Sequence, residues 1–456
     1  MLAGVLEAKQ IKTDAAALAK WGKDWTNGYT VAPSAIVFPE SNQQVIEIVR
    51  YAIDRGLPLV PSGGRTGLSG GAVASSGELV VSFDRMNHIL DFSPQDRRVT
   101  CQAGVLTNTL QQFALDQQLY YPVDFASSGS SQIGGNVATN AGGIRVIRYG
   151  LTRDWVVGLR AVTGRATMLN CNAGLIKNAT GYDFRHLLVG SEGTLGLITE
   201  VDLRLTTPPP AQKVMIVGIP EVKNLLNVLQ VFSRATKVSA FEFFSDLALE
   251  KVCAHRKLTP PLRHSVAYYA LIEFDDSDTE VAFDAFEQAL SGGWALDAVM
   301  SQSEAQAQSL WALREGISES IAQYTPYKND VSVCIHQVPE FLEEVDGFVQ
   351  ANYPDFEVCW YGHIGDGNLH LNILRPQGMD VAEFMAKGHA MSPKIFAMVA
   401  ARQGSISAEH GVGLLKQEFL GYSRSDEEID LMRGLKALFD PHQILNPGKL
   451  LKATTA

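Results

Sequence analysis

Two histidines near the C-terminal end of the chain have the residue type and the spacing of a metal site. His363 and His370 lie in the stretch WYGHIGDGNLHLNIL, residues 360–374, on either side of Asp366-Gly367. An Asp-Gly pair between two apolar runs predicts a two-residue type I′ turn of a β-hairpin. Counting back from this turn places His363 directly opposite His370, with their Cβ atoms roughly 5 Å apart. The two imidazoles could therefore hold one metal ion from a rigid hairpin.

A carboxylate and a third histidine could complete this site. The stretch SISAEHGVG, residues 405–413, places Glu409 beside His410. Imidazole and carboxylate groups are common ligands of zinc and other divalent cations. A bare histidine pair could also be a stacked surface pair, because most histidines bind no metal. The Asp-Gly turn, Asn372 on the same face and the separate Glu-His pair favour the metal site.

Two glycine-rich stretches could surround a cofactor that contains phosphate. The stretch PSGGRTGLSGGAV, residues 61–73, follows a predicted buried strand, and SSGSSQIGGNVATNAGGIRVIRYG, residues 127–150, mixes glycines with hydroxyl and amide side chains. Backbone amides of such loops can close around a phosphate. The first stretch matches neither the P-loop nor the Rossmann pattern. One such loop could be a surface turn, but two on one scaffold favour a long diphosphate ligand.

A helix-like segment carries cations that could bind a carboxylate. In SEAQAQSLWALREGISESIAQY, residues 303–324, Arg314 and Ser318 are four residues apart, and Lys328 follows. Residues at this spacing share one face of a helix, and Arg suits a two-pronged grip on a carboxylate. The alternative is an ordinary charged helix facing solvent.

The composition excludes several classes of protein. The 456 residues carry a formal net charge of -11, with 46% hydrophobic residues and no run of Lys and Arg, which argues against binding of nucleic acid.

The five cysteines have no C-x-x-C spacing, so we expect neither a disulfide framework nor a thiolate metal site, and the reducing cytoplasm fits best. No signal peptide and no segment that inserts into a membrane is apparent. An anionic substrate would need local cations.

The chain reads as two domains that position these residues. Near the N-terminus a strand (SAIVF), a helix with Ser41 as its N-cap and Gly56 at its end, and a strand (LPLV) predict mixed helix and sheet structure. Pro208 to Pro210 follow the strand-like run GLITEVDLRL and mark a boundary. A second domain of α+β type should start near Ala211. A last helix is expected around residues 427–437.

The two glycine-rich stretches resemble the FAD-binding domain of the vanillyl-alcohol oxidase and p-cresol methylhydroxylase superfamily. The resemblance extends to LIKNATGYDFRHLLVGSEGTLGLITEVDLRL, residues 175–205, where that family has an E-G-T-L-G-x-I flavin contact. It implies an α+β fold, with a two-part FAD-binding domain and an inserted substrate domain. We expect residues 1–208 to form the FAD-binding domain, residues 211–425 the substrate domain with the metal site, and residues 426–456 a segment that returns to the FAD domain.

The resemblance also implies how FAD is bound. Ser62 to Gly67 would wrap the pyrophosphate, and Glu192 and Ile198 would flank the adenine side. The isoalloxazine and ribose would be lined by Gly134, Gly135, Thr139, Asn140 and Gly143. The implied contacts are Ser62, Gly63, Gly64, Arg65, Thr66, Gly67, Ser131, Gly134, Gly135, Thr139, Asn140, Gly142, Gly143, Glu192, Ile198 and Asn446. Neither glycine-rich stretch contains the histidine or cysteine that tethers a covalent flavin. We therefore expect noncovalent FAD.

The C-terminal motifs narrow the resemblance to the branch that contains the D-2-hydroxyglutarate and D-lactate dehydrogenases, with its G-H-x-G-D-G-N-x-H and S-A-E-H-G-V-G motifs. The branch implies a divalent metal, most readily zinc with manganese or iron as alternatives, on His363, His370 and Glu409. It implies His410 as the catalytic base, also in contact with the substrate, and Asn372 as a substrate contact.

Within this branch, D-2-hydroxyglutarate dehydrogenases bind the substrate carboxylates through an Arg, a Thr four residues later and a Lys. Arg314, Ser318 and Lys328 follow that order, but Ser318 replaces the Thr and the spacing from Arg to Lys is about one residue shorter. The departure bears on which substrate is bound.

Oxidation of a 2-hydroxy acid needs a hydride acceptor, and no protein side chain accepts hydride, so the flavin must do so. The expected function is oxidation of D-2-hydroxyglutarate, or a similar small anionic D-2-hydroxy diacid, to the 2-oxo acid. The expected electron acceptor is a protein such as electron-transfer flavoprotein, or a quinone, and a homodimer is compatible with the resemblance. Two alternatives are a D-lactate or glycolate dehydrogenase and a noncatalytic flavoprotein subunit that relays electrons.

Overall fold

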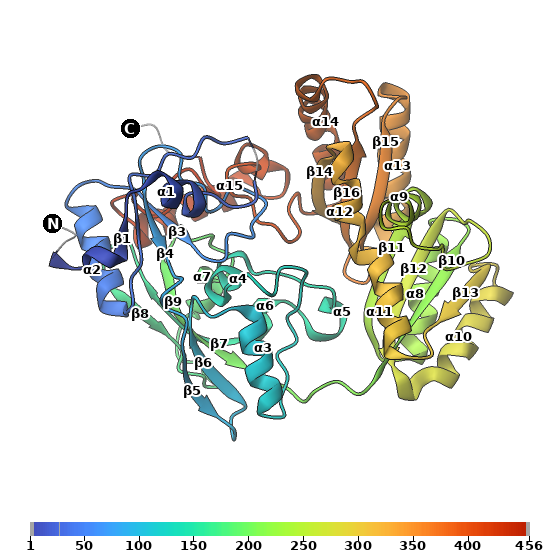
Figure 1. Ribbon diagram of the computed structural model, residues 1–456, viewed down its shortest axis with the longest axis horizontal. Coiled ribbons are helices and arrows are strands. Elements are labelled where there is room, and N and C mark those ends of the chain that lie inside the picture. The colour runs from blue at the N-terminus through green and yellow to red at the C-terminus, as the bar shows by residue number, and fades with distance from the viewer. Residues whose placement is uncertain (1–3, 27, 453–456) are drawn as a thin grey trace. The chain divides into compact units, whose positions relative to one another are not determined.

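The computed structural model describes residues 4–26 and 28–452, which fold into two units (Figure 1). Unit 1 comprises Met1–Gly143, Gly150–Pro208 and Glu409–Ala456, and unit 2 comprises Ile144–Tyr149 and Pro209–Ala408. The change of unit after Pro208 coincides with the expected boundary. Two bounds differ from expectation. The chain returns to unit 1 at Glu409 rather than at residue 426, and residues 144–149 group with unit 2.

The first sheet of unit 1 has the strand order β1-β2-β4-β3, in which the last three strands are parallel. Its strands are β1 (Ile11–Lys12), β2 (Ala35–Val37), β3 (Leu59–Ser62) and β4 (Leu79–Ser82). Helix α2 (Asn42–Ile53) connects β2 to β3, as the sequence predicts, and the Ser41 side chain caps it by accepting the N–H of Gln44. Its buried face, with Val45, Ile48 and Val49, joins one core cluster with Leu59 and Leu79.

The second sheet of unit 1 is antiparallel, with the order β5-β6-β9-β7-β8. Its strands are β5 (Ile89–Ser93), β6 (Arg98–Gln102), β7 (Val156–Val162), β8 (Met168–Cys171) and β9 (Leu197–Arg204). The helices of unit 1 are α1 (Ala15–Trp21), α2, α3 (Thr107–Asp116), α4 (Ile133–Thr139), α6 (Thr152–Trp155), α7 (Arg185–Leu188) and α15 (Asp426–Phe439). The last of these matches the helix expected around residues 427–437.

Unit 2 is built on a seven-stranded sheet with the order β13-β10-β12-β11-β15-β16-β14. Its pairings are antiparallel. The strands are β10 (Gln212–Ile219), β11 (Val238–Ser245), β12 (Tyr268–Asp275), β13 (Asp297–Met300), β14 (Tyr327–Ser332), β15 (Glu357–His363) and β16 (Asn368–Leu374). Its helices are α5 (Val146–Tyr149), α8 (Asn224–Ala235), α9 (Asp246–Arg256), α10 (Thr279–Ser291), α11 (Glu304–Glu315), α12 (Ile317–Ile321), α13 (Val338–Asn352) and α14 (Val381–Ala401).

The two faces of this sheet are covered by different helices. On one face Ala240, Phe244 and Leu271 pack in a single core cluster with residues of α9, α11 and α12. Trp360, whose neighbours in the strand belong to that cluster, points to the opposite face and contacts Phe341 of α13. The first face also carries the polar residues described below.

A short excursion of the chain explains why residues 144–149 belong to unit 2. Arg145 forms a two-pronged ion pair with Glu273, at 2.8 and 3.2 Å, and Arg148 pairs with Asp275. Both carboxylates lie on β12 and are buried. Buried carboxylates need such partners, so these two arginines fix residues 144–149, near the end of the second glycine-rich stretch. Among the described residues, no helix is both long and apolar enough to cross a membrane.

Candidate active site

The β-hairpin that carries the two histidines has a different register from the predicted one. Strand β15 ends at His363, which lies opposite Asn368, and His370 lies opposite Tyr361. The prediction of a two-residue type I′ turn was wrong, because four residues, 364–367, connect the strands. A type I′ turn needs positive φ at both central residues, and of the Asp-Gly pair only Gly367 has it.

Contacts with neighbouring segments set this longer loop. The N–H of Gly365 donates to the carbonyl of Phe241 on β11, and Val333 donates to the carbonyl of Gly367. A Cβ on Gly367 would stand 2.2 Å from the Val333 carbonyl oxygen. The predicted register was off by two residues, which leaves every side chain on its predicted face. His363 and His370 are therefore diagonal neighbours on one face, with ring centroids 5.2 Å apart.

Each histidine has a carboxylate beside its Nδ1 atom. His363 Nδ1 lies 2.7 Å from Oε1 of Glu242, on β11, and His370 Nδ1 lies 3.6 Å from Oδ1 of Asp330, on β14. Asp330 is held in turn by Asn368, whose Nδ2 donates to it at 2.7 Å. A carboxylate at Nδ1 fixes the ring and leaves Nε2 as the ligand atom. This arrangement suits a pair of metal ligands.

Glu409 is the first residue after Ala408, where the chain leaves unit 2. His363, His370 and Glu409 offer ligand atoms that all lie within 4.8 Å of one another. These are the three residues that the sequence analysis assigned to the metal, and His363 and His370 share one face of the unit 2 sheet. Imidazole and carboxylate donors in this number fit a catalytic divalent cation with open positions for substrate.

The segment that follows Glu409 is held by unit 1. Both carboxylate oxygens of Glu192 accept backbone N–H groups, from Val412 at 2.7 Å and from Gly413 at 2.8 Å. The Ser69 hydroxyl donates to the carbonyl of His410 at 2.8 Å. Burial raises the pKa of the Glu192 carboxyl, and the two N–H groups act in the opposite direction. Glu192, for which the sequence analysis predicted a contact with FAD, therefore positions the backbone that follows His410.

The predicted substrate residues gather on the same face of the unit 2 sheet as the histidines. Lys328 of β14 lies opposite Asn372 of β16, and its Nζ donates to Ser318 Oγ at 3.2 Å. Arg314 and Ser318 do not share one continuous helix as predicted, since α11 ends at Glu315 and α12 begins at Ile317. The chain still brings them both to this face.

Tyr361 lies at the centre of this group, and the sequence analysis missed it. Its side chain is buried and hydrogen-bonds with Ser318 and Asn372. The Arg314 guanidinium lies 4.7 Å from the centre of its ring, and the His370 ring lies 4.9 Å away. Burial raises the pKa of the Tyr361 phenol, against the lowering effect of Arg314. The alternation of its strand could have indicated Tyr361, since it lies two residues before His363.

Arg314 combines deep burial with unused hydrogen-bonding capacity. Its side chain is 9% exposed, and Nη2 lies 2.8 Å from Oε2 of Glu242. Within the described part of the chain its Nε and Nη2 atoms make no hydrogen bond. Buried polar groups without partners are rare and call for an explanation. An anionic ligand that accepts hydrogen bonds from these N–H groups would explain why they have none within the protein. Burial also lowers the pKa of the Lys328 ammonium on the same face of the sheet.

The first glycine-rich stretch and residues 127–143 of the second lie side by side in unit 1. A Cβ on Gly64 would stand 2.2 Å from the Ser130 carbonyl oxygen, and one on Gly63 would stand 3.7 Å from Cα of Gly135. Gly134 packs against Ala103, and a Cβ added to Gly134 would stand 2.5 Å from the Cβ of Ala103. Gly135, by contrast, has nothing within 4 Å of an added Cβ. Gly135 therefore faces open space next to the first glycine-rich loop, as a cofactor cradle requires.

Two other residues assigned to FAD, Arg65 and Asn446, form hydrogen bonds with the first glycine-rich loop. Arg65 (φ 61°) and Asn140 (φ 50°) have left-handed backbone conformations. Arg65 donates to the carbonyl of Gly63, and Asn446 donates to Gly71 and Glu192 at 2.9 and 2.8 Å. The remaining assigned residues lie in the same unit, within the two glycine-rich stretches or on β9: Ser62, Thr66, Gly67, Ser131, Thr139, Gly142, Gly143 and Ile198. Gly142 lies beside Glu409, whose Oε1 would be 3.1 Å from a Cβ on that glycine.

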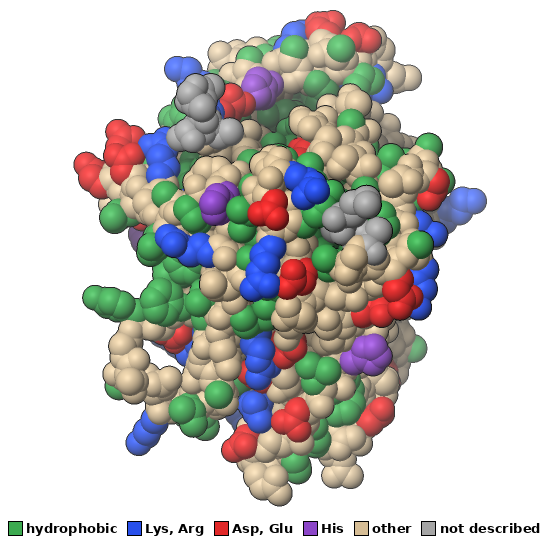
Figure 2. All heavy atoms as spheres, turned by 90° about the vertical axis from the view of Figure 1, so that its left-hand side faces the viewer, with side chains coloured by type: hydrophobic (Ala, Val, Ile, Leu, Met, Phe, Trp, Pro, Cys, Tyr) green, Lys and Arg blue, Asp and Glu red, His purple; other side chains and the backbone are tan. Residues whose placement is uncertain are grey.

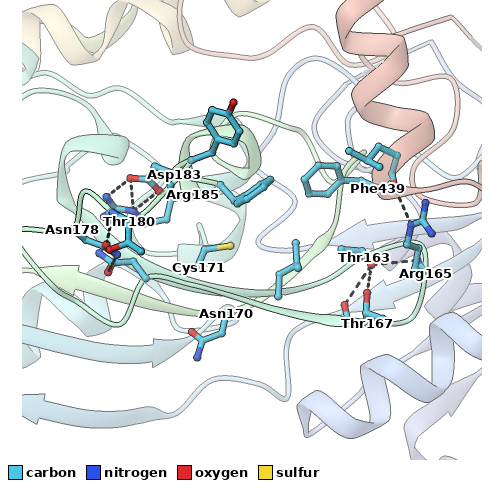
Figure 3. Close-up of a pocket in the computed structure, with 16 residues that line it drawn as sticks. Thr163, Arg165, Thr167, Asn170, Cys171, Asn178, Thr180, Asp183, Arg185 and Phe439 are labelled. Carbon is cyan, nitrogen blue, oxygen red and sulfur yellow. Dashed lines mark hydrogen bonds and ion pairs between the residues drawn. The ribbon is translucent and has the colours of Figure 1, made fainter.

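A separate cavity of about 610 Å³ lies between the β7–β8 hairpin, residues 178–185 and the end of α15 (Figure 3). Arg185 pairs with Asp183 at one end, and Arg165 donates to a backbone carbonyl at the other. None of the residues that the sequence analysis assigned to a site lines this cavity. It is therefore distinct from the metal and glycine-loop features.

The surface charge fits a site that depends on local cations. The formal net charge is -11, and acidic and basic side chains are intermixed on the face drawn in Figure 2. This face therefore carries no extended patch of one sign, and an anion that binds the protein would need a local cation such as Arg314.

Comparisons with known proteins agree with this architecture. Residues 33–172 match the model of an FAD binding domain, and residues 208–450, more than half of the chain, match the model of the C-terminal domain of FAD linked oxidases. The chain belongs to the FAD-linked oxidase family and is an FAD-dependent dehydrogenase. A D-2-hydroxyglutarate dehydrogenase of Stutzerimonas stutzeri is 54% identical over 98% of this chain and 97% of its own. The mitochondrial D-2-hydroxyglutarate dehydrogenase of Rattus norvegicus is 36% identical over 97% of this chain and 83% of its own.

Solved structures confirm the fold class. A p-cresol methylhydroxylase crystal structure superposes with a TM-score of 0.76 at 14% identity, and covers 99% of this chain and 96% of its own. An alkyldihydroxyacetonephosphate synthase gives a TM-score of 0.74 at 19% identity, over 98% of this chain and 84% of its own. The predicted α+β fold of the vanillyl-alcohol oxidase and p-cresol methylhydroxylase type is therefore confirmed.

Proposed function

We propose that this dehydrogenase oxidises D-2-hydroxyglutarate, or a D-2-hydroxy diacid of similar size, to the 2-oxo acid with FAD and a divalent metal. The observation that carries the proposal is the polar face of the unit 2 sheet. There two histidines suited to a metal lie on the same face as Arg314, which is ion-paired with Glu242 but whose Nε and Nη2 atoms make no hydrogen bond among the described residues. Relatives that are 54% and 51% identical bear the name D-2-hydroxyglutarate dehydrogenase. A metal and a carboxylate-binding cation together suit a hydroxy acid.

The glycine-rich loops of unit 1 hold FAD noncovalently in this proposal. The open space over Gly135 and its approach to Gly63 support this assignment. FAD, when bound, accepts the hydride from C2 of the substrate. The residues that contact FAD in this proposal are the sixteen named in the sequence analysis.

His363, His370 and Glu409 hold the divalent metal, for which zinc is the first choice and manganese or iron are alternatives. The distance of 4.8 Å or less between their ligand atoms supports this set. A divalent cation, when bound there, lowers the pKa of the substrate hydroxyl, as zinc lowers that of water from about 15.7 to about 7. His410, half-buried beside Glu409, then takes the hydroxyl proton as general base.

Arg314, Ser318 and Lys328 bind the carboxylate of the substrate that lies farther from the hydroxyl, and Asn372 contacts the substrate nearer the metal. The Lys328 to Ser318 hydrogen bond and the pairing of Lys328 with Asn372 place these groups on one surface. Two cations for this carboxylate favour a diacid over D-lactate or glycolate. The electron acceptor we propose is electron-transfer flavoprotein or a quinone. The five cysteines are free, which suits the cytoplasm.

Anaerobic bleaching of the flavin absorbance tests this function. D-2-hydroxyglutarate should bleach the flavin faster than D-lactate or glycolate, and His410→Ala should keep FAD but bleach it at least about 100-fold more slowly, because general acid-base catalysis contributes about 10² to 10⁴. An unbleached spectrum with every acid would indicate a subunit that only relays electrons. Faster bleaching by D-lactate would reassign the substrate.

Metal content, measured in the same preparations, tests the metal. Chelation should abolish bleaching, and zinc or manganese should restore it. Full turnover by protein shown to be metal-free would refute the metal-dependent mechanism.

A further inference from the structure

We infer that Glu242 is a positioning residue that sets the geometry of the metal site and of the substrate site at once. Its two carboxylate oxygens have different partners. Oε1 lies 2.7 Å from Nδ1 of His363, and Oε2 lies 2.8 Å from Nη2 of Arg314. The inference rests on the proposed function, because it concerns the metal and the diacid assigned there.

The position of Glu242 in the sheet is unusual for a carboxylate. It lies in the middle of β11, with apolar neighbours on both sides in the strand, and its side chain is 1% exposed. Ala240 and Phe244, which point to the same face, belong to the core cluster with α9, α11 and α12. A buried carboxylate costs free energy unless it is paired. The burial of Glu242 costs free energy, and we attribute its presence in this strand to the positions that it gives to His363 and Arg314.

Toward His363, Glu242 acts on the tautomer. A neutral His363 ring that donates its Nδ1 proton to Oε1 keeps the lone pair on Nε2, where it can bind a metal. Asp330 Oδ1 lies 3.6 Å from Nδ1 of His370, which is too far for a hydrogen bond. The shorter contact makes Glu242 the stronger of the two orienting groups.

Toward Arg314, Glu242 acts on the position of the guanidinium. The ion pair with Oε2 and the Tyr361 ring, 4.7 Å from the guanidinium carbon, restrain it from two directions. Its Nε and Nη2 atoms still have no hydrogen bond in the described chain. Arg314 is thus held in place with donors to spare, which is what a carboxylate-binding group needs.

The substitutions Glu242→Gln and Glu242→Ala separate the two roles. Glutamine keeps an oxygen that can accept from His363 but has no charge for Arg314, whereas alanine keeps neither. Glu273→Gln is the matched control, since Glu273 is a buried glutamate of the adjacent strand β12 whose partners are Arg145 and Trp311. Unfolding curves of all the variants establish that each is folded.

The first measurement is zinc affinity, by competition with a chromogenic chelator and without substrate. We expect zinc binding about 10- to 100-fold weaker in Glu242→Ala, the usual effect of losing such a partner, an intermediate value in Glu242→Gln and no change in the control. Wild-type zinc affinity in Glu242→Ala would overturn the inference. If the wild-type protein itself binds no zinc or manganese, the proposed metal site fails instead, and Glu242 has nothing to orient.

The second measurement is kcat/KM at saturating metal for D-2-hydroxyglutarate and for D-lactate. In both Glu242 variants the ratio of kcat/KM for D-2-hydroxyglutarate to kcat/KM for D-lactate should fall at least about tenfold, because D-lactate has no second carboxylate for Arg314. A purely structural role of Glu242 would lower kcat/KM for both substrates by the same factor. An unchanged preference in Glu242→Gln would overturn the link to Arg314, while bleaching of the wild-type flavin by D-2-hydroxyglutarate would leave the proposed function standing.

Discussion

The substitution Gly135→Ala tests where the cofactor binds. Gly135 lies within helix α4, and an added Cβ there would meet nothing within 4 Å. Alanine is more favourable than glycine in a helix interior by about 0.8 to 1.0 kcal/mol. The protein without FAD should therefore become more stable by up to about 1 kcal/mol. If FAD occupies the open space, however, the new methyl group overlaps it.

The expected loss of FAD affinity follows from that overlap. Overfilling a packed site costs about 1 to 3 kcal/mol, which corresponds to about 5- to 150-fold in Kd. Gly64→Ala is the contrasting variant, since its Cβ would stand 2.2 Å from the Ser130 carbonyl oxygen and 2.7 Å from Cα of Ser131. Backbone atoms cannot move aside cheaply, so this variant should lose stability even without FAD.

Two assays decide between these outcomes. Urea unfolding of the apoprotein measures stability, and quenching of flavin fluorescence during titration measures FAD affinity. Gly135→Ala should be at least as stable as the wild type but bind FAD more weakly, and Gly64→Ala should be less stable. Wild-type FAD affinity in Gly135→Ala would refute the assignment of the open space to the cofactor.

Further predictions concern buried charges and the substrate site. Burial raises the pKa of Asp346 to about 6, so the folded state binds the proton more tightly than the unfolded state, and the free energy of unfolding falls as pH rises from about 4 to 6. In urea unfolding, Asp346→Asn should be about 1 to 2 kcal/mol more stable than the wild type at pH 8 and equal to it at pH 4. An equal gain at both pH values would contradict this. Lys436→Met should cost about 3 to 5 kcal/mol in the same assay, because it leaves the buried carboxylate of Asp440 without its cation; a loss below about 1 kcal/mol would show the pair to be dispensable. Ser318→Ala should raise KM for the diacid about 3- to 10-fold with kcat unchanged, since it removes the acceptor of Lys328, whereas Ser318→Thr should not.

The sequence predicted the elements that depend on local patterns. The helix capped by Ser41 and the boundary at Pro208 follow from the chemistry of residues close to one another in the chain. The common face of His363 and His370 was also predictable, because side chains alternate along a strand and an error of two residues in register preserves the face.

Only the tertiary structure decided the features that depend on distant segments. The register of the hairpin is set by contacts of Gly365 with Phe241 and of Gly367 with Val333, which no local pattern encodes. In the sequence, Glu242 is a single acidic residue within an apolar strand. Only the folded sheet places it against His363 and Arg314.

The grouping of residues 144–149 with unit 2 has the same origin, since its ion pairs reach carboxylates more than a hundred residues away along the chain. The sequence by itself thus determined which residue types are available and which face of a strand each one takes. Packing between segments far apart in the chain decided which of them meet, because hydrogen bonds and ion pairs in a buried site form only where those segments come into contact.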